Sequence, residues 1–276
     1  MRIDDALIWA KFLLSNSDSP LLDAQILLAH VLEKESVYLM TWPERDLTAE
    51  QKSRFESLVE QRINGMPVAY LTGIREFWSL PLKVNNATLI PRPDTEILVE
   101  TALSYCTAQS CILDLGTGTG AIILALASEL PNSSCFAVDF NKDAVALANE
   151  NASSLNIKNV TFKQSNWFEN VVGQFDLIVS NPPYIDENDK HLNQGDVRFE
   201  PLSALVAKDN GLSDIRLIAQ QAKHYLNDNG ILIIEHGFEQ GNDVREIFAT
   251  LGYEGINTIK DYGDNERITV ARYHSK

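Results

Sequence analysis

Two segments of the chain combine residue types that suit the binding of a ligand. One is the run Asp-Leu-Gly-Thr-Gly-Thr-Gly-Ala, and its members Gly116, Thr117, Gly118, Thr119 and Gly120 form a glycine-rich loop. Glycines let the backbone approach a ligand closely, and a helix that follows such a loop offers free N–H groups and its positive dipole end. The loop therefore predicts a site for a nucleotide or nucleoside.

An acidic residue supports that prediction. Asp139 follows Gly120 by 19 residues, at the expected end of the next strand. A carboxylate at this place can accept hydrogen bonds from both hydroxyls of a ribose. Gly116, Gly118 and Ala121 also satisfy the dinucleotide fingerprint G-x-G-x-x-G/A, so the loop alone does not separate NAD from another adenosine cofactor.

The second segment is Asn181-Pro182-Pro183-Tyr184, which follows an apolar run. The two prolines keep the backbone extended where it leaves the sheet, and they have no N–H group to compete for nearby carbonyls. The Asn181 side-chain oxygen and the Pro182 carbonyl can accept two N–H bonds from a planar amino or amide group. The Tyr184 ring can pack on the flat face of that group. This pattern predicts a substrate site for a planar –NH2 group.

Alternating strand and helix patterns surround both segments. We expect seven strands, at 111–115, 135–138, 160–163, 175–179, 230–235, 255–259 and 267–272. We expect helices at 94–106, 119–130, 141–153, 211–227 and 240–250. Such alternation predicts an α/β fold with a mostly parallel sheet. In a doubly wound sheet the fourth strand lies next to the first, so the glycine loop and the Asn-Pro-Pro-Tyr segment should face each other.

The first quarter of the chain has helical apolar spacing instead. Pro20 suits the first position of a helix, Thr48 and Gln51 fit a capping box, and Gly65 with Pro67 should end the last helix. Short extended pieces follow. The resulting division is a helical domain at 1–72, a hairpin-like connector at 73–91 and a catalytic domain at 92–276.

Composition excludes several classes of protein. Of the 276 residues 45% are apolar, enough for a sizeable core, and no apolar stretch is long enough to cross a membrane. The N-terminus lacks the features of a signal peptide, which favours a cytoplasmic location. The net charge of −15 argues against a broad nucleic-acid surface. Three cysteines and five histidines show no metal-binding spacing, so we expect no metal site.

Taken together, the motifs resemble those of the class I S-adenosylmethionine methyltransferases that modify planar amino or amide nitrogens. Two further segments, Leu-Ile-Pro-Arg-Pro-Asp-Thr-Glu at 89–96 and Gly-Asp-Val-Arg-Phe-Glu-Pro at 195–201, are similar to the HemK/PrmC family, the peptide-chain release-factor glutamine methyltransferases. The resemblance spans nearly the whole chain. It implies a Rossmann-like sheet with a small N-terminal helical bundle that recognises the substrate. It also implies S-adenosylmethionine as methyl donor and the glutamine of a release-factor Gly-Gly-Gln motif as acceptor.

The resemblance also implies roles for individual residues. The family's cofactor site falls on Gly116, Thr117, Gly118, Thr119, Gly120, Asp139, Trp167 and Asn181, and its substrate site on Asn181, Pro182, Pro183 and Tyr184. Within the substrate site, Asn181, Pro182 and Tyr184 would serve catalysis. Asn166 stands where the family pattern leads us to expect an acid. Arg92, Arg198 and Glu200 either help to close the site or are solvated loop charges.

Alternative functions use the same residues. Adenine presents two N–H donors on its amino group, so a DNA adenine-N6 methyltransferase is the nearest alternative. The negative net charge of the chain and the lack of a recognisable DNA-reading domain argue against this alternative. A nucleotide-binding module leaves Asn-Pro-Pro-Tyr unexplained, and no second signature supports an NAD dehydrogenase. Methyl transfer from a sulfonium needs no catalytic base, so no histidine is assigned to catalysis.

Overall fold

The computed structural model describes residues 1–193 and 195–274, which form two compact units. The first unit contains Met1–Ile74 and the separate segment His191–Phe199. The second contains Arg75–Lys190 and Glu200–Lys276. The sequence prediction of a helical part at 1–72 did not include the segment at 191–199.

The first unit is a helical bundle. Its helices are α1 (Ile3–Leu13), α2 (Pro20–Leu32), α3 (Ser36–Thr41), α4 (Ala49–Ile63) and α5 (Val68–Thr72). Pro20 begins α2, and the predicted capping box of α4 is present, with the Gln51 N–H donating to the Thr48 hydroxyl at 3.1 Å. Fully buried Leu27, Leu28 and Phe55 form the centre of the bundle core. The short helices α3 and α5 were not predicted.

The segment 191–199 joins this unit through polar contacts. The Arg62 guanidinium donates to the carboxylates of both Asp23 and Asp196, each at 2.8 Å. The Arg198 guanidinium donates to the Asn64 carbonyl at 2.9 Å. Arg198 thus contacts the helical unit. Its side chain is exposed, which agrees with the alternative of a solvated loop charge, and a role in closing the site stays a prediction.

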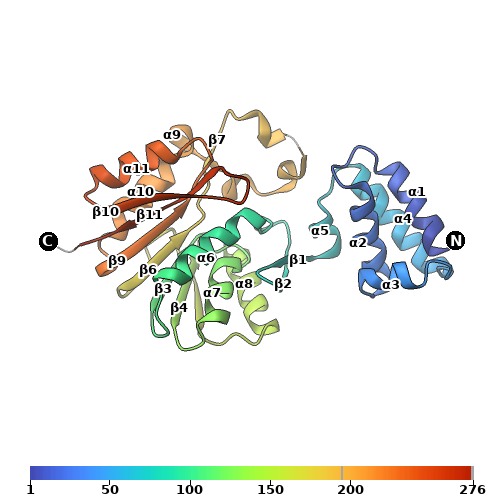
Figure 1. Cartoon of the computed structure of the whole chain (residues 1–276), viewed down its shortest axis with the longest axis horizontal. Coiled ribbons are helices and arrows are strands. Elements are labelled where there is room, and N and C mark those ends of the chain that lie inside the picture. Colours follow the sequence, from blue (N-terminus) through green and yellow to red (C-terminus); the bar gives the residue numbers. More distant parts are fainter. Residues whose placement is uncertain (194, 275–276) are drawn as a thin grey trace. The chain divides into compact units, whose positions relative to one another are not determined.

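A seven-stranded sheet lies at the centre of the second unit (Figure 1). Its strands are β3 (Cys111–Leu115), β4 (Ser134–Asp139), β5 (Val160–Gln164), β6 (Phe175–Ser180), β9 (Leu226–Glu235), β10 (Glu254–Lys260) and β11 (Glu266–Arg272). The order is β10-β11-β9-β6-β3-β4-β5, with only the β10–β11 and β11–β9 pairs antiparallel. The predicted fold class, a mostly parallel Rossmann-like sheet of seven strands, is confirmed.

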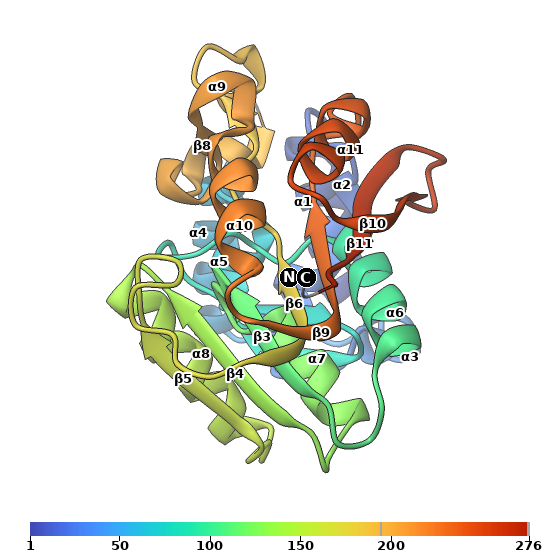
Figure 2. The ribbon, with the colours of Figure 1, turned by 90° about the vertical axis from the view of Figure 1, so that its left-hand side faces the viewer.

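Helices cover both faces of the sheet. They are α6 (Glu96–Tyr105), α7 (Ala121–Glu129), α8 (Lys142–Ser154), α10 (Ser213–Ala222) and α11 (Gly241–Thr250), and α10 and α11 lie above β6 and β9 in Figure 2. The short helix α9 (Lys208–Gly211) contacts α10 and the two-stranded sheet of β7 (Ile185–Asp186) and β8 (Val206–Ala207) instead. One buried cluster joins α6 and α7 to side chains such as Ile112 and Val179. A second joins α10 and α11 to Leu113 and Ile178, their neighbours on the strands. Successive strand residues point to opposite faces, so the strands contribute to both clusters.

Short elements complete the unit. They are the strands β1 (Ile74–Phe77), β2 (Leu80–Lys83), β7 (Ile185–Asp186) and β8 (Val206–Ala207), and the 3-10 turns η1 (Pro93–Thr95) and η4 (Leu202–Ala204). Two further 3-10 turns are η2 (Lys190–Asn193) and η3 (Gly195–Phe199), and all of η3 and most of η2 belong to the helical unit. The hairpin β1–β2 lies within the predicted connector. Its turn residues Trp78 and Ser79 both have positive φ, 53° and 58°, as in a type I′ turn, in which glycine or asparagine is usual.

The predicted helix at 211–227 was wrong at its C-terminal end. Helix α10 ends at Ala222, and Leu226 already belongs to β9, where it pairs with Phe175. The Phe175 N–H donates to the Tyr225 carbonyl at 2.7 Å. Residues 226 and 227 therefore form a strand paired with β6, although the apolar spacing of 222–227 favours a helix.

Candidate functional site

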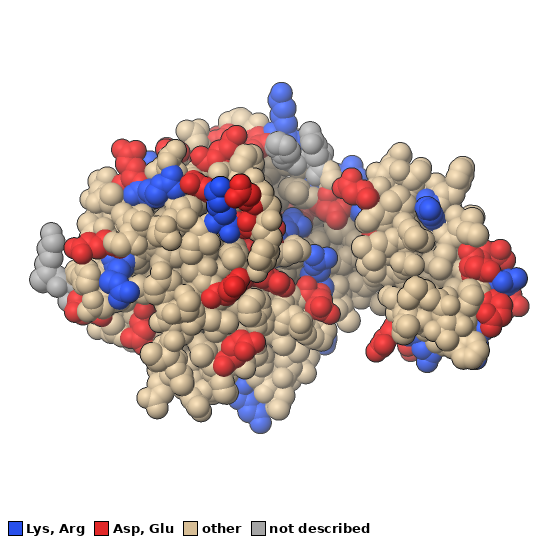
Figure 3. All heavy atoms as spheres, viewed as in Figure 1, with Lys and Arg blue, Asp and Glu red and all other residues tan. Residues whose placement is uncertain are grey.

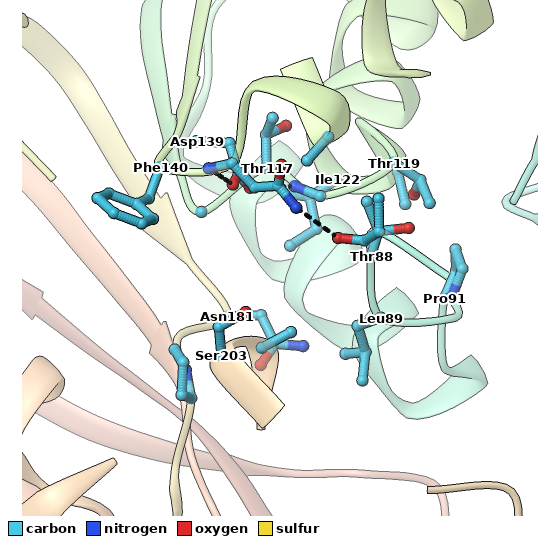
Figure 4. A pocket seen from close by; sticks show the side chains of 18 of the residues that line it. Thr88, Leu89, Pro91, Thr117, Thr119, Ile122, Asp139, Phe140, Asn181 and Ser203 are labelled. Carbon is cyan, nitrogen blue, oxygen red and sulfur yellow. Dashed lines mark hydrogen bonds between the residues drawn. The ribbon is translucent and has the colours of Figure 1, made fainter. Parts of the chain in front are cut away.

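The cavity in the second unit lies where β3, β4 and β6 end. Its volume is about 320 Å³, and it is lined by Gly116, Thr117, Gly118, Thr119, Asp139, Trp167, Asn181 and Pro183 among others. Strand β6 pairs with β3 in parallel, and Ser180 lies opposite Leu115. The glycine loop and the Asn-Pro-Pro-Tyr segment therefore leave the sheet side by side, as predicted, and residues of both line one cavity. Figure 4 shows Asp139 and Thr117 on one side of it and Asn181 on another.

The glycine loop owes its shape to positive φ angles. Gly116 has a φ of +72°, and a Cβ there would lie 3.5 Å from the Trp167 ring, in the space between loop and ring. Gly120 has a φ of +84° and precedes α7, but it is not among the residues that line the cavity in the described part of the chain. A Cβ atom at Gly120 would lie 3.0 Å from the Leu124 side chain and 3.3 Å from that of Ala148, so Gly120 allows close packing at this position.

The buried carboxyl of Asp114 holds the glycine loop through a hydrogen bond from Thr117. Asp114 is fully buried at the end of β3, and its Oδ2 accepts a hydrogen bond from the Thr117 hydroxyl at 2.6 Å. Its Oδ1 has no hydrogen-bond partner among the described residues. Burial raises the pKa of Asp114 from 3.8 to about 7, with a smaller contribution in the same direction from Asp139.

This carboxyl predicts a pH dependence of stability. Between about pH 4 and pH 7 the folded chain binds more protons at Asp114 than the unfolded chain does. The contribution of Asp114 to the free energy of unfolding is therefore fully present below about pH 4 and is lost as the pH rises through 7. Asp114→Asn should make the free energy of unfolding fall less steeply between pH 5.5 and 7.5 in urea titrations. Glu239→Gln, in an exposed loop, is the control, and an unchanged slope in Asp114→Asn would contradict the prediction.

Asp139 has two backbone partners of its own. Its Oδ2 accepts from the Gly118 N–H and its Oδ1 from the Asn141 N–H, each at 2.8 Å. Burial raises its pKa, while these two hydrogen bonds oppose the shift. Each carboxylate oxygen has a second lone pair. Asp139 can thus hold the loop and still accept a hydrogen bond from a ligand in the cavity.

Trp167 has a partner that sequence reasoning missed. Its indole interacts by a hydrogen bond with the Asp214 carboxylate, which opposes the rise in the pKa of Asp214 that burial causes. Both residues line the cavity. Asn166 also lines it, but its amide donates to the Glu169 carboxylate at 2.7 Å. The acidic side chain expected at Asn166 is thus absent, and Asp214, from the start of α10, supplies a carboxylate at the same cavity.

The Asn-Pro-Pro-Tyr segment divides between the cavity and the interior. Asn181 and Pro183 line the cavity, whereas Pro182 and Tyr184 are not among its lining residues in the described part of the chain. The Asn181 side-chain nitrogen donates to the Thr95 hydroxyl at 3.3 Å. The Tyr184 hydroxyl donates to Glu235 Oε1 at 3.4 Å, and burial raises its pKa.

Glu200 holds a loop that forms part of the cavity wall. Its buried carboxylate accepts from the Ile90 N–H at 3.2 Å and from the Arg92 guanidinium at 2.5 Å. Arg92 and its neighbours Leu89 and Pro91 line the cavity. Arg92 and Glu200 therefore fix a cavity loop. The buried Glu200 is not a solvated loop charge, and a role of the pair in closing the site stays a prediction.

Known proteins share this chain's sequence over nearly its full length. Models of the PrmC N-terminal domain and of a methyltransferase domain match residues 5–73 and 107–253. A release factor glutamine methyltransferase of Escherichia coli is 55% identical over 263 residues, which cover 95% of each chain. One of Aliivibrio fischeri is 54% identical over 264 residues, 94% of this chain and 93% of the relative. The chain belongs to the release factor glutamine methyltransferase family.

A solved structure supports the fold of this family. A methyltransferase from Pyrococcus furiosus aligns with a TM-score of 0.56 at 18% identity, over 81% of this chain and 100% of that one. Within residues 1–193 and 195–274, no helix is long and apolar enough to span a membrane. The same residues contain no group of three or more histidine, cysteine or acidic side chains placed to hold a metal ion.

Proposed function

We propose that this protein transfers a methyl group from S-adenosylmethionine to the side-chain amide nitrogen (N5) of the glutamine in the Gly-Gly-Gln motif of peptide-chain release factors. The family membership supports both the reaction and the acceptor. The observation that carries the proposal is the position of Asn181 in the same cavity as the glycine loop. A protein that modifies a translation factor is expected in the cytoplasm.

The residues of the cavity fit S-adenosylmethionine. Gly116, Thr117, Gly118 and Thr119 would hold it at the loop, where a side chain at position 116 would narrow the space beside Trp167. The Trp167 ring suits a flat base, and Asp139 suits the ribose hydroxyls. When bound, S-adenosylmethionine supplies a methyl group on a positively charged sulfur, which leaves as a neutral thioether. Gly120 would contribute through the backbone shape of the loop.

The protein has to position a poor nucleophile, because the lone pair of an amide nitrogen is delocalised into its carbonyl. The Asn181 side-chain oxygen and the Pro182 carbonyl would accept the two N–H bonds of the glutamine amide. Pro183 and Tyr184 would keep this exit of β6 rigid. Fixed placement of the reacting nitrogen can supply up to about 7–11 kcal/mol. The nitrogen becomes acidic only as it takes up the methyl group, and its proton can then leave to water, so no side-chain base is needed.

Asp139→Ala should mainly weaken the binding of S-adenosylmethionine. Hydrogen bonds to a charged acceptor contribute roughly 1.5–3 kcal/mol, so the dissociation constant should rise about 10- to 100-fold. Isothermal titration calorimetry measures this change. Asp139→Asn keeps one acceptor oxygen for the Gly118 N–H and should lose less affinity. Unchanged affinity in Asp139→Ala would place the carboxylate outside the cofactor site.

One assay tests the acceptor. The protein is incubated with methyl-labelled S-adenosylmethionine and either a release factor, the same factor with the Gly-Gly-Gln glutamine replaced, or adenine-containing DNA. We expect label in the unmodified release factor alone. Label in the DNA, or equal label in both forms of the factor, would overturn the proposal.

The DNA-methyltransferase alternative gains no support. The relatives described above carry the release-factor name. On the face seen in Figure 3, lysine and arginine side chains are interspersed with aspartate and glutamate. A protein that neutralises many phosphates needs an excess of lysine and arginine, whereas this chain has a net charge of −15.

The helical part at 1–72 is proposed to dock the release factor. A model of the PrmC N-terminal domain matches residues 5–73. Several large apolar side chains of this unit are exposed, among them Ile8, Phe12 and Met40, at 69%, 79% and 69%. Exposed aromatic and aliphatic residues of this kind are typical of protein interfaces.

A further inference from the structure

The orientation of the Asn181 amide matters for the proposed reaction. The glutamine nitrogen carries two N–H donors, so only the oxygen of Asn181 can accept from it. If the Asn181 amide were turned over, its own N–H bonds would face those of the substrate. The site therefore needs a device that selects one of two orientations of nearly the same shape.

The first part of such a device is Thr95, in the turn η1 that precedes α6. The Asn181 nitrogen donates to its hydroxyl at 3.3 Å, and the Thr95 side chain is almost fully buried. A threonine hydroxyl can both donate and accept. It selects one orientation of Asn181 only if its own proton is committed to another acceptor.

Glu235 is that acceptor. It ends β9, and since Ser180 lies opposite Ile234, the same register brings Glu235 beside Asn181. The Tyr184 hydroxyl donates to Glu235 Oε1 at 3.4 Å, and hydrogen bonding by Thr95 lowers the pKa of the same carboxyl and so favours its ionised form. An ionised carboxylate can only accept. The Thr95 proton is then directed to Glu235, which leaves the Thr95 lone pairs for the Asn181 N–H.

The surroundings of Glu235 favour this arrangement. The residue is 1% exposed, and its Oε2 has no hydrogen-bond partner among the described residues. Burial raises the pKa of Glu235 to about 7, and the charge of Asp94 acts in the same direction. Hydrogen bonding by Thr95 and the positive charge of Arg267 oppose this rise, so the carboxylate is ionised above about pH 7. A buried acid with an unpaired oxygen is costly for stability and needs a functional explanation.

We propose that Thr95 and Glu235 are positioning residues for methyl transfer, which hold the Asn181 amide with its nitrogen toward Thr95 and its oxygen toward the acceptor nitrogen. This inference rests on the proposed function. Neither residue touches the reacting atoms. They act through Asn181, and Glu235 acts also on the Tyr184 hydroxyl.

The test compares variants of equal shape. Thr95→Val removes the hydroxyl, and Glu235→Gln adds an N–H donor that can reverse the hydrogen bond to Thr95. Both should lower kcat about 10- to 100-fold, the loss expected from misplacing a reacting group. Affinity for S-adenosylmethionine should stay within about threefold. Thr95→Ser keeps the hydroxyl and should restore kcat to within about threefold of the unmodified protein.

A matched control is Thr101→Val, at a threonine of α6 that is likewise buried, with 7% exposure, but lies outside this network. It should leave kcat unchanged. Equal losses of kcat in Thr95→Ser and Thr95→Val, or unchanged kcat in Thr95→Val and Glu235→Gln, would overturn the inference. A parallel loss of cofactor affinity would likewise overturn it, because it would show damage to the whole site.

A second measurement needs no activity. The side-chain N–H signals of Asn181 in nitrogen-15 NMR spectra are identified by their loss in Asn181→Ala. They should shift in Thr95→Val and Glu235→Gln and stay in place in Thr101→Val; unmoved signals in the first two would overturn the inference. If the unmodified protein fails to methylate a release factor, the proposed function fails, whereas the NMR result still tests the orientation of Asn181.

Discussion

Asn181→Ala should lower the kcat for methylation of a release factor by about 10²- to 10³-fold. The variant loses the side-chain oxygen that accepts from the reacting nitrogen, and removal of one fixed polar group in a comparable role costs about 2.7–4 kcal/mol in the transition state. The binding of S-adenosylmethionine should change little, because the glycine loop and Asp139 are intact. Labelled methyl transfer at saturating substrates measures kcat, and calorimetry measures the affinity.

Asn149→Ala is a suitable control for this variant. Asn149 is exposed on α8, where its amide donates to the Val145 carbonyl of the same helix. It should show unchanged kcat. Turnover near that of the unmodified protein in Asn181→Ala would contradict the assignment of Asn181 to the acceptor site.

Deletion of residues 1–72 should lower kcat/KM for an intact release factor by at least about 100-fold. A selective protein acceptor needs a second contact surface, about 800 Å² per partner in a standard interface, and this part of the chain is the proposed source of it. The cavity residues all lie in the second unit, so cofactor binding should persist. Steady-state methylation of the whole factor measures the effect.

Two measurements make this experiment decisive. Circular dichroism and cofactor titration establish that the truncated chain is folded. A short peptide with the Gly-Gly-Gln motif should be methylated by the truncated and full chains at similar rates. A folded truncated chain with unchanged kcat/KM for the whole release factor would show that the helical part does not dock it.

The parts of the site that the sequence predicts correctly are local in the chain. The glycine loop and the Asn-Pro-Pro-Tyr segment each lie within a few consecutive residues, and strand order alone brings them together. Strong apolar patterns likewise predicted the strands of the sheet. The conformation of the turn between β1 and β2 could not be predicted from Trp78 and Ser79, because neither residue type favours positive φ.

The missed residues act through partners that are distant in the sequence. Asp214 gains its role from Trp167, and Glu235 from Thr95 and Tyr184. Glu200 was named from the sequence, but its partner Ile90, 110 positions away in the chain, was not. A single acidic residue at the end of an apolar strand is indistinguishable in sequence from an ordinary solvated one, so only the tertiary structure identifies these side chains.

The discontinuous helical unit has a consequence for the order of events during synthesis. Arg62 is made early, but Asp196, one of its two carboxylate partners, is made after the first four strands of the seven-stranded sheet. At 5–20 residues per second, the ribosome needs roughly 7–27 s to add the intervening residues. During that interval Arg62 has only Asp23 as a carboxylate partner. The helical unit is therefore expected to reach its final stability only after much of the sheet has been translated.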